Sequence, residues 1–245
     1  MTDQGRRTGD AVSIAGDYQY RALHHGPPTQ RAWHRLKLGL LDWCFQVRPG
    51  MRVLDVGCGS GVFANAMRER GAVVTAVDAN PDAIAFASTT FAREGLTFRE
   101  GLLDELAFPD ASFDGASCLE VVEHVYPHQV AELLSSLHRV LVPGGKLLVT
   151  TPNYRGAWPL IEWAADRTSS VAKMDADQHI TRFHRRSLED AIKGAGFRVV
   201  RSTTYCTVAP FLAPLSERLC SWTAQREQSA NLPFGNLLAV VAEKP

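Results

Sequence analysis

Short apolar runs alternate with amphipathic stretches through most of the chain, and this alternation predicts the architecture. The run Val-Leu-Asp-Val at 53–56 precedes a glycine-rich turn, and apolar residues recur at helical spacing before it, from Trp33 to Cys44. Nearly continuous apolar strands between helices are typical of a parallel sheet covered on both faces. The pattern predicts an α/β fold with strands at 53–56, 72–77, 97–99, 113–119, 146–150, 197–205 and 237–242, and helices at 62–69, 129–141 and 187–194 and from Pro81 onward.

The alternation breaks after residue 150, which divides the chain into parts. In segments 151–182 and 206–234 the apolar residues show no strong helical or strand periodicity, and these segments are predicted to be insertions beside the sheet. The last two strands are far apart in sequence, and we expect them to form an antiparallel pair at the sheet edge. Residues 1–48 are predicted to form an N-terminal arm and a lid helix. Residues 49–245 are predicted to form one doubly wound domain around a mostly parallel, seven-stranded sheet.

Composition and charge exclude several classes of protein. Hydrophobic residues make up 45% and charged residues 21% of the 245 positions, which is typical of a globular chain. Lys and Arg total 26, as do Asp and Glu, so the net charge is zero and no nucleic-acid partner is expected. The 5 Cys are scattered without a CxxC pair, which favours a reducing compartment. Because the sequence shows neither a signal peptide nor a transmembrane segment, it predicts a cytoplasmic protein.

A glycine-rich motif, Asp55-Val-Gly-Cys-Gly-Ser-Gly61, follows the first strand. In open α/β sheets, ligands bind beyond the carboxyl ends of the strands, where glycines let the backbone approach them. The spacing differs from the dinucleotide pattern GxGxxG, and the Lys of a phosphate-binding loop is missing. Asp55 would repel a pyrophosphate but could hold an ammonium group. Asp78, at the end of the second strand, could accept hydrogen bonds from ribose hydroxyls.

The joint pattern resembles that of class I S-adenosylmethionine-dependent methyltransferases. It combines Val-Leu-Asp-Val-Gly-Cys-Gly-Ser-Gly at 53–61, Val77-Asp78, Phe-Pro-Asp-Ala-Ser-Phe-Asp at 108–114 and Pro-Gly-Gly at 143–145. The resemblance implies a Rossmann-like fold and S-adenosylmethionine as cofactor, with S-adenosylhomocysteine as product. The implied cofactor-binding residues are Asp55, Gly57, Cys58, Gly59, Gly61, Asp78, Ala79, Leu119 and Glu120, with the adenine contact at Leu102, Leu103 or Asp104.

A second cluster, Glu120-Val-Val-Glu123-His124, follows the fourth strand. It is similar to the Glu-x-x-Glu-His of ubiquinone-biosynthesis O-methyltransferases, in which such a run supports a divalent ion near a catechol. The resemblance therefore implies a divalent ion, Mg²⁺ or Mn²⁺, bound by these two carboxylates and the imidazole together with a fourth ligand from elsewhere in the chain. Two alternatives stay open, namely His124 as a general base hydrogen-bonded to Glu120 or Glu123, and a Glu-His that only orients the loop.

Three further features surround the expected site. His179 could be a fourth metal ligand, the proton acceptor or a loop-bonding residue. Tyr18, Tyr20 and Arg21 could close over the cofactor as an N-terminal lid. Leu215, Leu219 and Trp222 lie at helical spacing, with Arg218 on the opposite face. This pattern is compatible with a weak contact to a membrane surface or with a contact between two copies of the chain. A monomer and a homodimer are therefore both open alternatives.

Together these observations predict an enzyme that methylates a small molecule, with oxygen of a phenol or catechol as the favoured acceptor. The predicted catalytic residues are His124, His179 and Glu120. N- or C-methylation of another small metabolite and a non-catalytic cofactor-binding protein are the alternatives. A nucleic-acid methyltransferase is disfavoured by the zero net charge.

Overall fold

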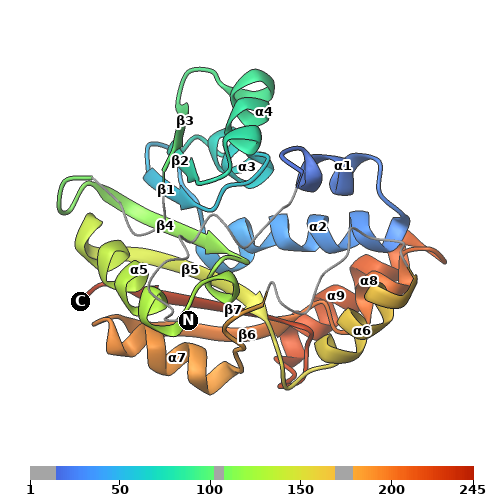
Figure 1. Ribbon diagram of the computed structural model, residues 1–245. Helices are drawn as coiled ribbons and strands as arrows, with labels where there is room; N and C mark the ends of the chain where they lie inside the picture. Colours follow the sequence, from blue (N-terminus) through green and yellow to red (C-terminus); the bar gives the residue numbers. More distant parts are fainter. Residues whose placement is uncertain (1–14, 102–107, 169–178) are drawn as a thin grey trace, which may run out of the picture.

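The computed structural model describes residues 15–101, 108–168 and 179–245. In this part of the chain, seven strands form one sheet in the order β3-β2-β1-β4-β5-β7-β6 (Figure 1). The strands are β1 (Arg52–Val56), β2 (Val73–Asp78), β3 (Leu96–Glu100), β4 (Phe113–Leu119), β5 (Leu141–Pro152), β6 (Arg198–Tyr205) and β7 (Leu237–Glu243). The predicted strands are thus confirmed, and most of their ends differ by at most one residue. The exception is β5, which begins at Leu141 rather than at residue 146 and so includes the Pro-Gly-Gly segment.

Strand direction follows the sequence prediction. Neighbours from β3 to β5 pair in parallel, whereas β7 is antiparallel both to β5 and to β6. The expected antiparallel pair of the last two strands is therefore present at this end of the sheet, with β6 outermost. The order of the strands across the sheet reverses direction between β1 and β4. Open α/β sheets bind their ligands at such switch points.

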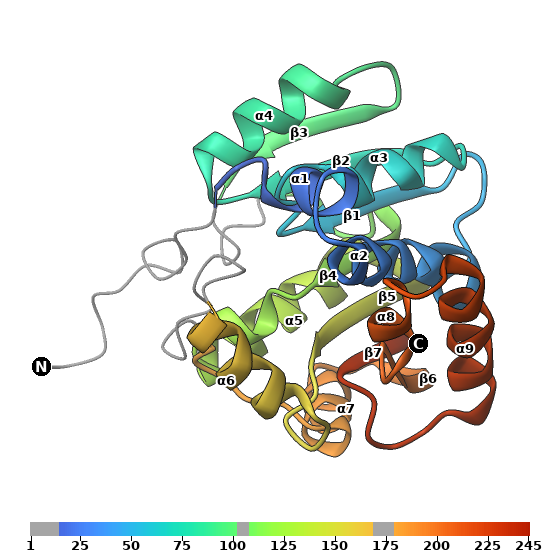
Figure 2. The same cartoon turned by 90° about the vertical axis from the view of Figure 1, so that its right-hand side faces the viewer.

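Helices cover both faces of the sheet. They are α1 (Tyr18–His24), α2 (Pro28–Leu40), the π-helix η2 (Leu41–Phe45), α3 (Val62–Glu69), α4 (Pro81–Phe91), the short η3 (Val122–His124), α5 (Pro127–Val140), α6 (Trp158–Thr168), α7 (Arg185–Gly194), α8 (Ala209–Leu212) and α9 (Glu217–Ala230). Figure 2 shows α5 and α7 on one side of the strands, and α8 and α9 on the other.

The core lies in two layers because successive strand residues point to opposite faces. Leu54 of β1 packs with α5 and α7, whereas Val53 packs with η2 and α3. Leu40, Leu41 and Phe45 are fully buried in the second layer, so the predicted lid helix is also part of the core.

The two predicted insertions contain helices. Segment 151–182 contains α6, and segment 206–234 contains α8 and α9. Leu215, Leu219 and Trp222 are 78%, 39% and 56% exposed, and a partner for them remains a prediction. None of the helices in the described part of the chain has both the length and the apolar character that crossing a bilayer requires.

Candidate active site

The glycine-rich turn lies at the switch point, between β1 and α3. Gly57, Gly59 and Gly61 have positive φ angles of 72°, 50° and 78°, which glycine adopts without strain. Side chains would also lack space: a Cβ atom on Gly57 would collide with Val121, and one on Gly59 with the amide of Gln19. Burial of Cys58, within the same turn, raises the pKa of its thiol well above the usual range, so this thiol is unsuited to act as a nucleophile.

Asp78 is fixed beside this turn at the end of β2. Its Oδ2 accepts a hydrogen bond from the Gly59 N–H at 2.7 Å, and its Oδ1 accepts one from the Asn80 N–H at 2.8 Å. Burial raises the pKa of Asp78, and the hydrogen bonds from Asn80, Gly59 and Ala79 oppose that rise. The carboxylate is therefore held in a rigid frame at the position that the sequence predicts for the ribose.

Asp55 lies near the end of β1 and is 2% exposed, and one of its oxygens has no hydrogen-bond partner among the described residues. Its Oδ1 accepts a hydrogen bond from the Ser117 hydroxyl at 2.6 Å, whereas its Oδ2 accepts none from the part of the chain that the structure describes. Burial raises the pKa of Asp55 to about 7, and the nearby Asp78 contributes to the rise. A buried acceptor without a donor is costly, and the ammonium group of a bound amino acid would supply the donor. These residues therefore fit S-adenosylmethionine.

The N-terminal helix α1 contacts the glycine-rich turn, and its role as a lid over the cofactor remains a prediction. Oε1 of Gln19 accepts a hydrogen bond from the Ser60 N–H at 2.9 Å. Tyr20 packs its ring against Phe86 and Phe91 of α4, with centroids 5.3 and 6.0 Å away. Gln19 was not among the predicted site residues, since a single Gln in a polar arm gives no signal in the sequence.

Glu120 follows β4 directly and forms an ion pair with a lysine of α2. The Lys37 Nζ lies 2.6 Å from Glu120 Oε2, and Lys37 is only 8% exposed. Glu120 has a φ angle of 56°, which costs energy for a residue with a side chain, and its buried Oε1 has no hydrogen-bond partner in residues 15–101, 108–168 and 179–245. Sequence reasoning missed Lys37, although a signal existed: it occupies the apolar stripe of its helix, between Trp33 and Leu40.

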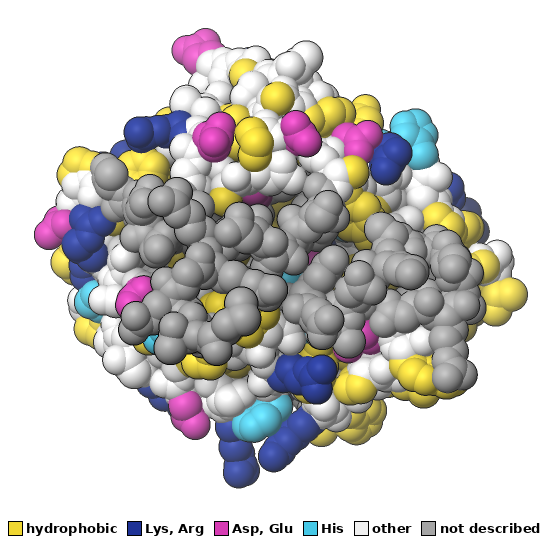
Figure 3. Space-filling view, viewed as in Figure 1, with side chains coloured by type: hydrophobic (Ala, Val, Ile, Leu, Met, Phe, Trp, Pro, Cys, Tyr) yellow, Lys and Arg dark blue, Asp and Glu magenta, His cyan; other side chains and the backbone are white. Residues whose placement is uncertain are grey.

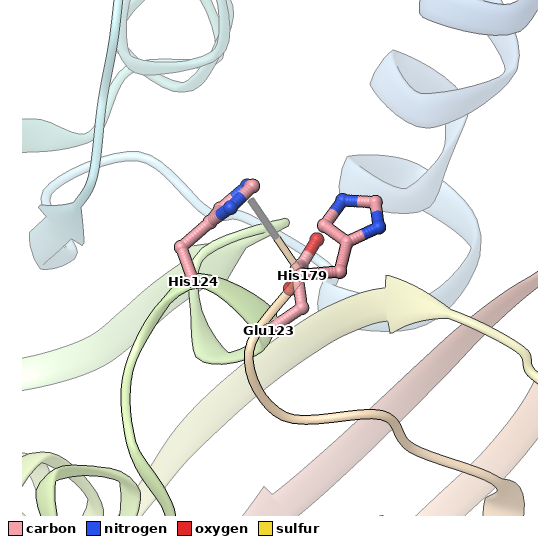
Figure 4. Close-up of side chains that lie close together, drawn as sticks. All are labelled: Glu123, His124 and His179. Atoms are coloured by element: carbon pink, nitrogen blue, oxygen red, sulfur yellow. The ribbon is translucent and has the colours of Figure 1, made fainter. Parts of the chain in front are cut away.

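Glu123, His124 and His179 come together from η3 and from the segment before α7 (Figure 4). One ligand-type atom from each lies within 4.8 Å of the others. Glu123 is 1% exposed, and its Oε2 accepts a hydrogen bond from the Thr151 hydroxyl at 2.9 Å. Burial and the neighbouring Glu120 raise the pKa of Glu123 to about 8, so its carboxyl group holds a proton at neutral pH.

His179 lies beside His124, with ring centroids 5.1 Å apart. Burial, followed by the proximity of His124 and Arg182, lowers the pKa of His179 to about 4. The imidazole is therefore neutral at pH 7 and able to accept a proton. Both predicted catalytic histidines thus share one corner of the site, close to the end of β4.

This donor set does not fit Mg²⁺. The group contains two imidazoles and one carboxyl group, whereas Mg²⁺ prefers an octahedron of oxygen ligands. Glu120, part of the predicted metal set, lies outside this group and is paired with Lys37. We therefore derive no chemical step through Mg²⁺.

The remaining predicted cofactor contacts are Leu119 and the residues expected to bind the adenine. Leu119 ends β4 and is half-buried beside the predicted methionine end. The predicted adenine contacts Leu102, Leu103 and Asp104 lie outside the described residues.

A family model described as a methyltransferase domain matches residues 28–202. The chain belongs to this methyltransferase family. The match includes the glycine-rich turn, Asp78 and the corner that contains Glu120, His124 and His179.

Curated relatives and solved structures agree with this assignment. The chain is 38% identical over 134 residues to a ubiquinone biosynthesis O-methyltransferase from Xylella fastidiosa, covering 53% of each chain. It is 31% identical over 138 residues to a protein of the same name from Pseudomonas aeruginosa, covering 55% of each. The chain thus spans about half the length of these relatives. A SAM dependent methyltransferase from Archaeoglobus fulgidus has the same fold, with a TM-score of 0.65, 23% identity and coverage of 93% and 99%.

Proposed function

We propose that this methyltransferase-family chain transfers the methyl group of S-adenosylmethionine to an oxygen of a small phenol or catechol. The observation that carries the proposal is a neutral, buried imidazole, His179, which lies beside His124 in the loop after β4, the strand that pairs with β1 and its Asp55. The relatives named for O-methylation support oxygen as the acceptor atom. Bound S-adenosylmethionine would supply an electrophilic methyl group on a sulfonium sulfur.

The protein's contribution is to bind, orient and remove a proton. Asp78 would accept hydrogen bonds from the ribose hydroxyls, and the unpartnered Oδ2 of Asp55 would face the amino group, directly or through a water. His179, with His124 beside it, would take the proton from the acceptor hydroxyl as its oxygen attacks the methyl carbon. Orientation of the two reacting groups accounts for much of the rate enhancement expected of such a site.

A small acceptor is favoured over a nucleic acid by the distribution of charge. The net charge is zero, and the described basic and acidic side chains are interspersed on the face shown in Figure 3. A protein that binds nucleic acid through its phosphates usually gathers Lys and Arg on one surface.

Mass spectrometry tests the proposal on products formed from S-adenosylmethionine and a panel of a catechol, a monophenol and an aniline. We expect the catechol or the phenol to gain a methyl group on oxygen, and the aniline to remain unmodified. Reactions with EDTA and with added Mg²⁺ form a parallel series, which we expect to give equal rates. Methylation of the aniline alone, or of none of the three, would contradict the proposed acceptor.

A further inference from the structure

Glu162 of α6 contacts His179 on the ring nitrogen Nδ1. Glu162 Oε1 lies 2.8 Å from Nδ1, and the side chains of both residues are 9% exposed. The Tyr154 hydroxyl lies 2.8 Å from the same nitrogen, and 3.3 and 3.4 Å from the two carboxylate oxygens of Glu162. Two side chains from separate segments, Glu162 and Tyr154, therefore meet at one edge of the His179 imidazole.

The chemistry of these groups selects one arrangement of protons. A carboxylate only accepts hydrogen bonds, so a Tyr154 O–H that donated to an unprotonated Nδ1 would leave the ring lone pair facing Glu162 Oε1 at 2.8 Å, which is repulsive. In the favourable arrangement Nδ1–H donates to Glu162 Oε1, and the Tyr154 hydroxyl donates to the same carboxylate. A hydrogen bond from one ring nitrogen of a histidine determines which nitrogen carries the proton. With Nδ1 protonated, the other nitrogen, Nε2, has a lone pair and can accept a proton.

The backbone around this group is fixed as well. The Thr181 N–H donates to the Glu123 carbonyl at 3.0 Å, and the Thr181 hydroxyl donates to the Val125 carbonyl at 2.6 Å. The Tyr154 N–H donates to the Phe183 carbonyl at 2.9 Å. These bonds tie the segment of His179 to the loop after β4 and to the end of β5, so that Glu162 acts on a ring whose position is already constrained.

We propose that Glu162 is a positioning residue that holds His179 in the Nδ1–H tautomer, so that Nε2 faces the reaction as the proton acceptor. The inference rests on the proposed function, because it assigns His179 the role of base in the methyl transfer. Nothing in the sequence pattern around Glu162 marks it as a site residue; only the fold brings it to His179.

The methyl transfer moves one proton and two electron pairs. The hydroxyl proton of the acceptor moves to Nε2, and an electron pair of the acceptor oxygen forms the new C–O bond. The C–S bond breaks, and its electron pair stays on sulfur, which gives S-adenosylhomocysteine and the methyl ether. The Glu162 carboxylate stabilises the imidazolium that results, and the proton then leaves to water.

The experiment compares the wild-type chain, Glu162→Gln and the matched control Glu189→Gln. Glu189 pairs with Lys193 on α7, 3.6 Å away, and does not contact His179. ¹⁵N NMR of the imidazoles reports the tautomer. The chain contains 8 histidines, so the His179 signals are assigned by their loss in His179→Gln. The rate of phenol methylation and the affinity for S-adenosylhomocysteine are measured on the same samples.

We expect the Nδ1–H tautomer of His179 in the wild-type chain and in Glu189→Gln. In Glu162→Gln the amide can donate to Nδ1, so the Nε2–H tautomer should appear and kcat should fall by about 100-fold or more. KM for the phenol and cofactor affinity should stay within about twofold, because ground-state binding is intact. Glu162→Asp should recover part of kcat.

An Nε2–H tautomer in the wild-type chain would overturn the inference, as would an unchanged tautomer in Glu162→Gln. If Glu162→Gln does not fold, the spectra of the wild-type chain and of Tyr154→Phe still test the inference. Both should show the Nδ1–H tautomer of His179, and an Nε2–H tautomer in either would contradict the role of Glu162. If no phenol is methylated, the proposed function fails, while the NMR result judges the positioning by Glu162 separately.

Discussion

The buried carboxyl group of Asp55 should make the stability of the chain depend on pH in an unusual direction. In the folded chain the pKa of Asp55 is raised to about 7 by burial, against an ordinary value of 3.8. The unfolded chain therefore releases this proton at lower pH than the folded chain does. Stability is lost as pH rises between the two pKa values, and the loss is complete above the folded one.

The magnitude follows from the same two pKa values. Because ionisation and folding are linked, the ionisation of Asp55 lowers the free energy of unfolding by about 2 to 3 kcal/mol between about pH 5 and pH 8. In Asp55→Asn this titration is removed. The free energy of unfolding of the wild-type chain should therefore fall, relative to that of Asp55→Asn, by this amount across the range.

Urea unfolding at a series of pH values measures the difference. Asp114→Asn is the matched control, because Arg52 lowers the pKa of that partly exposed carboxyl, so its titration is complete below pH 5. Parallel pH curves for the wild-type chain and Asp55→Asn would refute the reasoning, since they would show that Asp55 is already ionised in the folded chain. Asp55→Asn should also bind S-adenosylhomocysteine at least about tenfold more weakly, because a charge-assisted hydrogen bond is lost.

Three further predictions concern other parts of the site. Asp78→Ala should weaken S-adenosylhomocysteine binding by about 10- to 100-fold, whereas His124→Ala should leave it unchanged and slow turnover; equal effects in calorimetry would contradict this division. Lys37→Met should lower the free energy of unfolding by about 1 to 3 kcal/mol, because Glu120 loses its partner, and Lys37→Met/Glu120→Gln should recover most of the loss. EDTA should leave the initial rate of methylation unchanged; loss of activity that Mg²⁺ restores would contradict our assessment of the donor set.

The fold and the cofactor end were predictable because their signals are local in sequence. Strands such as 53–56 are continuous apolar runs, and a glycine turn with positive φ angles has few alternatives to glycine. Asp78 ends β2, and Asp55 lies one residue before the end of β1, so parallel pairing of these strands brings both to the same edge without further information.

The acceptor side was less predictable because its contacts are long-range. Lys37 and Glu120 are 83 positions apart, and Glu162 reaches His179 through a helix in a segment without strong periodicity. The metal set implied by resemblance contained Glu120, but in the fold its carboxylate turns to Lys37, and His179 joins Glu123 and His124 instead. Local spacing cannot distinguish these pairings, because each depends on where α2 and α6 pack.

Calorimetric titration with S-adenosylhomocysteine, with NADH as the control ligand, tests the central claim most directly. The arrangement of Asp55, Asp78 and the glycine-rich turn predicts low-micromolar binding of S-adenosylhomocysteine and none of NADH, whose pyrophosphate Asp55 would repel. Binding of NADH alone, or of neither ligand, would contradict the account of the cofactor site and the methyl transfer derived from it.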